Sequence, residues 1–141
     1  MPQTIEEETI RKPNVCLVDD DDMMLSLFSR VLKRTGCDVI TAKGPEAAAD
    51  VLASTQIDVL ISDLRMPTIA DGEQLLQLAK SRYPSLAVWM MSSEFCSEMR
   101  NHLMQSGAAL CIEKPFNAEK IGQLIDQLGI PNLMRDPAGA R

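Results

Sequence analysis

Five polar residues stand at the ends of short apolar runs in this 141-residue chain, and their types suit metal and phosphoryl chemistry. They are Asp19, Asp20, Asp63, Ser92 and Lys114. Three carboxylates gathered in one crevice would repel one another unless a cation neutralised them. Mg²⁺ (or Mn²⁺) prefers such hard oxygen ligands. A lysine can pair with carboxylate or phosphate oxygens, and a serine hydroxyl can donate a hydrogen bond.

A carboxylate can also act as a covalent nucleophile toward a phosphoryl group. The transferred group then needs positioning and charge stabilisation more than covalent help, and a metal ion, a lysine and a hydroxyl supply both. Aspartates that follow strands also cap helices, and we expect Asp21 and Asp22 to do only that. The chemical interpretation therefore depends on whether the five polar residues converge.

The elements that would bring them together follow from the hydrophobic pattern. Apolar runs without polar alternation predict strands buried on both faces, and the amphipathic segments between them predict helices. The expected strands are residues 15–18, 39–41, 57–61, 86–91 and 109–112. Strict alternation of strand and helix predicts an α/β fold with a parallel sheet, helices on both faces and right-handed crossovers. The carboxyl ends of such strands share one edge, where ligands bind, so the polar residues should meet there.

Two local patterns add expectations about the third and fourth helices. Asp71-Gly72 indicates a turn ahead of the third helix. Met99 and Met104 are expected to fill the core beneath the fourth helix, because methionine commonly fills gaps there.

Composition narrows the class of protein. The net charge of −6 argues against direct nucleic-acid binding and against docking on an anionic membrane. No apolar stretch reaches the roughly 18 residues of a membrane helix, and residues 1–12 lack the apolar core of a secretory signal, so we expect a cytoplasmic protein. The four cysteines form no CxxC pair and there is one histidine, so no zinc site is expected. Cys16 and Cys111 are expected to be buried free thiols.

At the polar residues described above, the sequence resembles the receiver domains of two-component response regulators, in particular the single-domain chemotaxis type. The resemblance runs from about Asn14 to Leu128. The matching motifs are residues 16–21 (CLVDDD), 61–67 (ISDLRMP), 71–72 (DG), 91–93 (MSS) and 113–116 (EKPF). It implies a flavodoxin-like, doubly wound sheet of five parallel strands in the order 2-1-3-4-5. Residues 14–129 would form the receiver, with a flexible extension at 1–13 and a flexible tail or the start of a linker at 130–141.

The resemblance also implies roles for the acidic residues. Asp63 would be the phosphoacceptor. Asp20 would bind Mg²⁺ (or Mn²⁺) directly, and Asp19 would help through water. Asp63 and the backbone carbonyl of Arg65 would complete the protein ligands.

A second group of residues would form the switch. Lys114 would pair with the phosphoacceptor before phosphorylation and with the phosphoryl group after it, and the bond from Lys114 to Pro115 is expected to be cis. Ser92 would supply the hydroxyl that moves toward the phosphoryl group, and Ser93 follows it in the same loop. The family often carries Tyr or Phe where this chain has Cys111, so the switch is expected to be read out differently here.

The implied partners are a sensor histidine kinase or phosphotransfer protein, and either a downstream protein or a missing effector domain. The fourth helix, fifth strand and fifth helix would form the output face and a possible homodimer contact, with no direct nucleic-acid binding and no membrane. Catalysis would be limited to self-phosphotransfer and slow autodephosphorylation.

Three alternative interpretations of the sequence stay open. They are the N-terminal receiver fragment of a longer regulator with a DNA-binding or enzymatic output domain, a pseudo-receiver that is never phosphorylated, and a small metal-dependent phosphatase with an aspartate nucleophile. A nucleotide-binding flavodoxin-like domain is disfavoured, because no Gly-rich loop follows the first strand.

Overall fold

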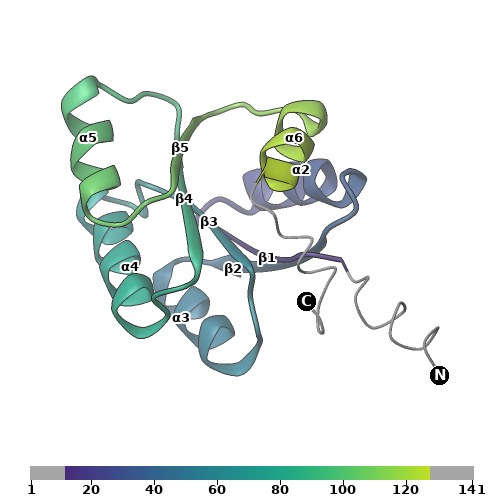
Figure 1. Cartoon of the computed structure of the whole chain (residues 1–141), viewed down its shortest axis with the longest axis horizontal. Helices are drawn as coiled ribbons and strands as arrows, with labels where there is room; N and C mark the ends of the chain where they lie inside the picture. The colour runs from purple at the N-terminus through teal and green to yellow at the C-terminus, as the bar shows by residue number, and fades with distance from the viewer. Residues whose placement is uncertain (1–11, 128–141) are drawn as a thin grey trace.

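The computed structural model describes residues 12–127, in which five strands alternate with five helices (Figure 1). The strands are β1 (Asn14–Asp19), β2 (Asp38–Lys43), β3 (Val59–Asp63), β4 (Ala87–Ser92) and β5 (Leu110–Glu113). The helices are α2 (Asp22–Arg34), α3 (Pro45–Ser54), α4 (Ile69–Arg82), α5 (Ser97–Gln105) and α6 (Ala118–Gln127). The expected tail at 130–141 and all but the last two residues of the expected extension at 1–13 lie outside the described residues.

The strands form one parallel sheet in the order β2-β1-β3-β4-β5, which confirms the predicted α/β class and strand order. The register keeps the carboxyl ends level. Asp63 on β3 pairs with Met91 on β4, and Ser92 on β4 pairs with Glu113 on β5. Residues at the ends of these strands are therefore held side by side at one edge of the sheet.

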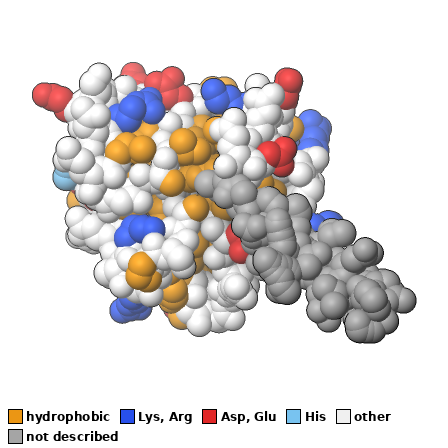
Figure 2. All heavy atoms as spheres, in the orientation of Figure 1, with side chains coloured by type: hydrophobic (Ala, Val, Ile, Leu, Met, Phe, Trp, Pro, Cys, Tyr) orange, Lys and Arg blue, Asp and Glu red, His pale blue; other side chains and the backbone are white. Residues whose placement is uncertain are grey.

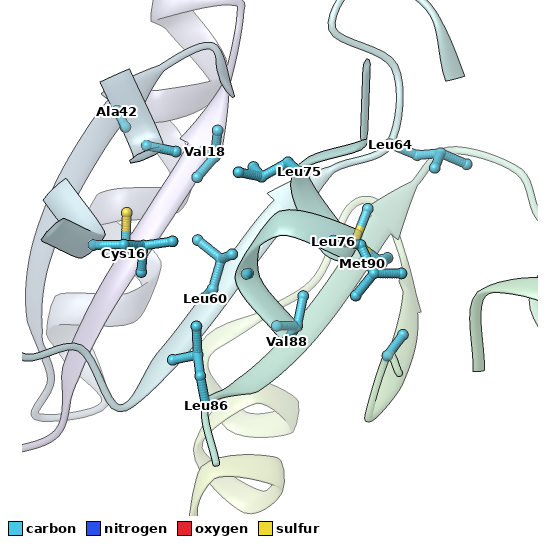
Figure 3. Close-up of a cluster of buried hydrophobic side chains, with 14 of the residues drawn as sticks. Cys16, Val18, Ala42, Leu60, Leu64, Leu75, Leu76, Leu86, Val88 and Met90 are labelled. Atoms are coloured by element: carbon cyan, nitrogen blue, oxygen red, sulfur yellow. The ribbon is translucent and has the colours of Figure 1, made fainter. Parts of the chain in front are cut away.

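Helices cover both faces of the sheet, with α3, α4 and α5 on one face and α2 and α6 on the other (Figure 1). Successive strand residues point to opposite faces. Leu60 and Val88 thus join the cluster beneath α3 and α4 (Figure 3), whereas Ile61 and Trp89 join the cluster beneath α2 and α6. Every residue of β3 is buried, as expected for a strand covered on both faces.

Helix α2, which follows β1, begins as the sequence predicts. Asp21 is the N-cap of α2, and its carboxylate accepts hydrogen bonds from the backbone N–H groups of Met23 and Met24 at 2.8 and 3.4 Å. None of the helices within residues 12–127 combines the length and the apolar composition that a membrane crossing requires.

The prediction of a turn at Asp71-Gly72 is wrong, because both residues lie inside the first turn of α4. Thr68 precedes the helix, and the Asp71 carboxylate accepts hydrogen bonds from the Thr68 N–H and hydroxyl, each at 2.9 Å. Gly72 is required for a different reason: a Cβ at this position would overlap the backbone carbonyl of Leu64. The glycine lets α4 approach the loop that follows β3.

Other details around α5 depart from the expectations. Met104 is 43% exposed instead of filling the core, whereas its neighbour Leu103 is fully buried. The helix begins at Ser97, so Phe95 lies in the loop that leads into it. The Lys114–Pro115 bond is cis as expected from the resemblance, and a second cis bond joins Met66 and Pro67.

Candidate functional site

Three carboxylates meet at the carboxyl edge of the sheet. Asp19 is the last residue of β1, Asp63 is the last residue of β3, and Asp20 follows Asp19. Each offers one carboxylate oxygen, and these oxygens lie within 4.8 Å of one another. Asp19 and Asp63 are buried, and Asp20 is exposed. A small dication with octahedral oxygen coordination fits such a set, because its opposite ligands lie about 4 Å apart at Mg²⁺–oxygen distances of about 2.1 Å.

Lys114 places an ammonium group between the two buried carboxylates. Its Nζ atom lies 3.1 Å from Asp63 Oδ1 and 3.3 Å from Asp19 Oδ2. The backbone N–H of Lys114 donates to the carbonyl of Ser92 at 2.8 Å, which fixes the start of the loop after β5 against the end of β4. The pair with Asp63 is the one expected from the resemblance, and the pair with Asp19 was not anticipated. One ammonium group facing three carboxylates leaves the crevice negative when all of them are ionised.

An aromatic wall closes the other side of the crevice. Phe28 of α2 stacks on Phe116 with ring centroids 4.4 Å apart, and the Lys114 Nζ atom lies 6.0 Å from the centroid of the Phe28 ring. The sequence predicts Phe28 only as a core residue, because the helical spacing of apolar residues does not show which of them border a ligand site. Phe116 is recognisable only through the Lys-Pro-Phe motif.

These groups line a cleft of about 410 Å³ that is acidic on one side and apolar on the other. Its lining residues are Asp19, Asp20, Asp21, Met24, Leu27, Phe28, Asp63, Ser93, Lys114 and Pro115. The cleft therefore brings together most of the residues predicted to be functional.

The remaining predicted residues lie around the cleft. Ser92 is buried, and its hydroxyl oxygen accepts a hydrogen bond from the Glu94 N–H at 3.3 Å. Arg65 is exposed in the loop after β3, where the role of its carbonyl stays a prediction. Cys111 is half-buried on β5 and packs against the core cluster beneath α3, α4 and α5, away from the cleft. The expected burial holds fully for Cys16 and only partly for Cys111.

The electrostatics of the cleft act mainly on Asp63. Burial raises the pKa of Asp63 from its ordinary 3.8 to about 6, and the negative charges of Asp19 and Asp20 push the pKa in the same direction. Lys114 opposes this rise through its charge and its hydrogen bond. At neutral pH most of Asp63 is still ionised. The crevice therefore holds a nucleophilic carboxylate whose negative charge is only partly neutralised by its neighbours.

Comparison with known proteins settles the family. The model of the response regulator receiver domain matches residues 15–126. The chain belongs to this family. The receiver domain is 36% identical over 111 residues to the response regulator protein FleR of Pseudomonas aeruginosa, which covers 79% of this chain and 23% of FleR. It is 36% identical over 121 residues to the DNA-binding transcriptional regulator NtrC of Proteus hauseri, covering 84% of this chain and 25% of that protein. The chain thus spans about a quarter of the length of these relatives.

Solved structures agree with this assignment. The chemotaxis protein CheY4 of Vibrio cholerae superposes with a TM-score of 0.74 at 27% identity, covering 83% of this chain and 98% of CheY4. The signal receiver domain of a LuxO repressor protein from Vibrio parahaemolyticus gives a TM-score of 0.78 at 22% identity, over 93% of this chain and all of that domain. The second likeness concerns the fold alone. The receiver domain therefore has the fold and the acidic crevice of two-component signalling proteins.

Proposed function

We propose that the receiver domain accepts a phosphoryl group on Asp63 from a sensor histidine kinase or phosphotransfer protein, and that phosphorylation alters the surface it presents to partners. One observation carries the proposal: the buried carboxylate of Asp63 lies within reach of two further carboxylates and 3.1 Å from an ammonium group. Such a cluster is unfavourable as a purely structural arrangement, because buried like charges repel. It suits a site that binds a dication and a phosphoryl group.

The donor set fits Mg²⁺ (or Mn²⁺). All of the acidic side chains in the crevice offer hard oxygen atoms, and none of the described residues adds a sulfur or imidazole ligand to the group. Asp20 and Asp63 would bind the ion directly, Asp19 would act through water, and the carbonyl of Arg65 would be a further ligand. When bound, the ion would neutralise charge on the phosphoryl oxygens.

The positions of the side chains support transfer of a phosphoryl group to Asp63. A carboxylate oxygen of Asp63 attacks phosphorus as the bond between phosphorus and the donor nitrogen breaks, and the electron pair of that bond leaves with the imidazole. Lys114 then pairs with phosphoryl oxygens, while its ammonium group keeps its ion pair with Asp19. The Ser92 oxygen accepts from Glu94, which leaves its hydroxyl hydrogen free to donate to the phosphoryl group.

The proposal extends to partners and context. The relatives are longer proteins, and NtrC is named as a DNA-binding regulator. We therefore propose that this receiver controls either a separate protein or an effector domain, with no direct contact of its own to nucleic acid or membrane. A cytoplasmic location and a homodimer through α5, β5 and α6 belong to the same proposal. The domain would catalyse phosphoryl transfer to its own Asp63 and then slowly hydrolyse that phosphoryl group, without turning over other substrates.

The decisive experiment is incubation with acetyl phosphate, with and without Mg²⁺, followed by intact mass measurement. The wild-type domain should gain one phosphoryl group only with Mg²⁺, and Asp63→Asn should gain none. Asp50→Asn, which changes a carboxylate on the outer part of α3, is the matched control and should be labelled normally. Equal labelling of Asp63→Asn would remove Asp63 from its role. Repeated hydrolysis of added phosphoesters would favour the phosphatase alternative.

A further inference from the structure

The side chain of Arg100 leaves α5 and reaches the outer strand of the sheet. Its Nη1 atom donates a hydrogen bond to the backbone carbonyl of Cys111 at 3.0 Å, and its Nη2 atom lies 3.8 Å from Glu113 Oε2. The guanidinium carbon also lies 5.0 Å from the centroid of the Phe95 ring. One side chain thus contacts the strand, its carboxyl end and the loop that precedes α5.

The contact with Cys111 satisfies a group that has no strand partner. β5 is the last strand in the sheet order, and an edge strand presents backbone carbonyl groups that no neighbouring strand can use. Arg100 donates to one of these carbonyls. Burial raises the pKa of the Cys111 thiol, and the charge of Arg100 lowers it, so the guanidinium lies close enough to act on this side chain.

Both segments that Arg100 contacts lead back to the phosphoacceptor crevice. Phe95 stands three residues after Ser92 on the loop from β4 to α5, and Glu113 is paired with Ser92 and precedes Lys114. Ser92 is therefore directly connected to both segments that Arg100 contacts. Figure 1 shows α5 and α6 on either side of β5, and Figure 2, in the same orientation, shows hydrophobic side chains gathered on this face with both acidic and basic side chains along its upper rim.

The energetics suit a contact that is made and broken. The side chains of Arg100 and Glu113 are 41% and 60% exposed, and ion pairs exposed to this extent contribute little to stability. The position held here by Cys111 lacks the aromatic side chain that the family often carries there, and the side chain that contacts its backbone carbonyl is the guanidinium of Arg100.

We propose that Arg100 is a positioning residue that reports the state of the Asp63 crevice to the outer edge of the sheet. With no phosphoryl group, Arg100 is docked on Cys111 and Glu113. When the loop after Ser92 closes on a phosphoryl group, the start of α5 moves, Arg100 leaves β5, and the Cys111 carbonyl and Glu113 carboxylate become available to a partner. The proposal rests on the proposed phosphorylation of Asp63.

The test combines two measurements on the whole chain in Mg²⁺, before and after acetyl phosphate. The first is the ¹⁵N NMR signal of the Arg100 Nε–H group, and the second is amide hydrogen exchange of α5 and β5 followed by mass spectrometry. In the wild-type domain the Arg100 signal should shift and exchange in β5 should rise on phosphorylation. In Arg100→Ala, labelling should persist, whereas exchange in β5 should already be raised and should not rise further. Lys120 lines the same pocket beside β5 as Arg100. The variant Lys120→Ala therefore removes a nearby cation and should behave as wild type.

The outcomes separate the two proposals. Absence of labelling in the wild-type domain contradicts the proposed function, whereas labelling with no change in the Arg100 signal overturns the role of Arg100 alone. A wild-type exchange response in Arg100→Ala would also overturn it. If circular dichroism shows that Arg100→Ala is unfolded, Arg100→Lys takes its place. Lysine keeps the charge but loses the planar fork, so its exchange response should be reduced, and a full response would contradict the inference.

Discussion

The ammonium group of Lys114 lies 3.3 Å from the carboxylate of Asp19, although 95 positions separate the two residues along the chain. This contact ties the end of β1 to the loop after β5 across the crevice, while the same ammonium group contacts Asp63. Asp19 therefore keeps Lys114 in place when the charge on Asp63 changes. The pair makes Lys114 a structural counter-ion, and under the proposed function the same ammonium group would also bind a phosphoryl group.

Replacing Lys114 tests this double role. Lys114→Ala leaves three carboxylates without their shared cation, so the free energy of unfolding in metal-free buffer should fall by about 1–3 kcal/mol. Mg²⁺ should restore more stability to the variant than to the wild type, because the ion replaces the lost charge. Urea denaturation with and without Mg²⁺ measures both effects, with Lys120→Ala as the control. A variant as stable as wild type without metal would show that the ammonium group is dispensable for the resting crevice.

The raised pKa of Asp63 predicts a specific dependence of stability on pH. Because the folded state holds the proton up to about pH 6 and an unperturbed aspartate only to about pH 3.8, this residue's contribution to stability is greatest below about pH 4 and is lost as the pH rises toward 6. Asp63→Asn should therefore be more stable than wild type at pH 7 in metal-free buffer. We expect a gain of about 1–2 kcal/mol, less than two pKa units represent, because the cleft admits water.

The measurement is the difference in unfolding free energy between the two proteins at several pH values. The difference in unfolding free energy should fall to about zero near pH 4. Saturating Mg²⁺ should reverse the sign of the difference at pH 7, because the ion stabilises the wild type preferentially. Asp50→Asn should show no such dependence. A constant difference across the range would mean that Asp63 does not titrate as the crevice requires.

Gly72 provides a test of how α4 shapes the site. A Cβ at this position would overlap the carbonyl of Leu64, so Gly72→Ala must push α4 away from the loop that carries Arg65. We expect a loss of about 1–3 kcal/mol in stability and weaker Mg²⁺ binding, measured by denaturation and by calorimetry. Gly122→Ala is the matched control, because its Cβ would meet only Thr35 at ordinary contact distances of 3.7 and 3.8 Å. Alanine should be neutral or stabilising in that helix.

How far the sequence predicts the molecule can be judged from such positions. The sequence predicts that Asp63 and Ser92 lie at one edge because parallel strands align their ends, and this prediction needs only the order of strands and helices. The sequence predicts a turn at Gly72, because local sequence cannot distinguish a glycine needed for a positive φ from one needed for close helix approach. The sequence does not show that Met104 is exposed, because a short polar helix has a weak apolar pattern, and Leu103 is the one fully buried residue of α5.

The sequence also does not predict contacts between segments that are distant along the chain. The stack of Phe28 on Phe116 and the contact of Arg100 with Cys111 depend on where helices lie against the sheet. Residue type and spacing along the chain do not encode those positions.

Substitutions of Ser92 and Ser93 test the conformational switch separately from phosphorylation of Asp63. Ser92→Ala removes the buried hydroxyl at the end of β4, whereas Ser93→Ala changes an exposed neighbour in the same loop. If the Ser92 hydroxyl draws the loop toward the phosphoryl group, Ser92→Ala should still be labelled by acetyl phosphate, because Asp63 and the acidic cluster remain. Its α5 and β5 segments should then show little or none of the rise in hydrogen exchange expected for wild type, and Ser93→Ala should retain that rise. A full response in Ser92→Ala would show that another group links the crevice to the outer edge of the sheet.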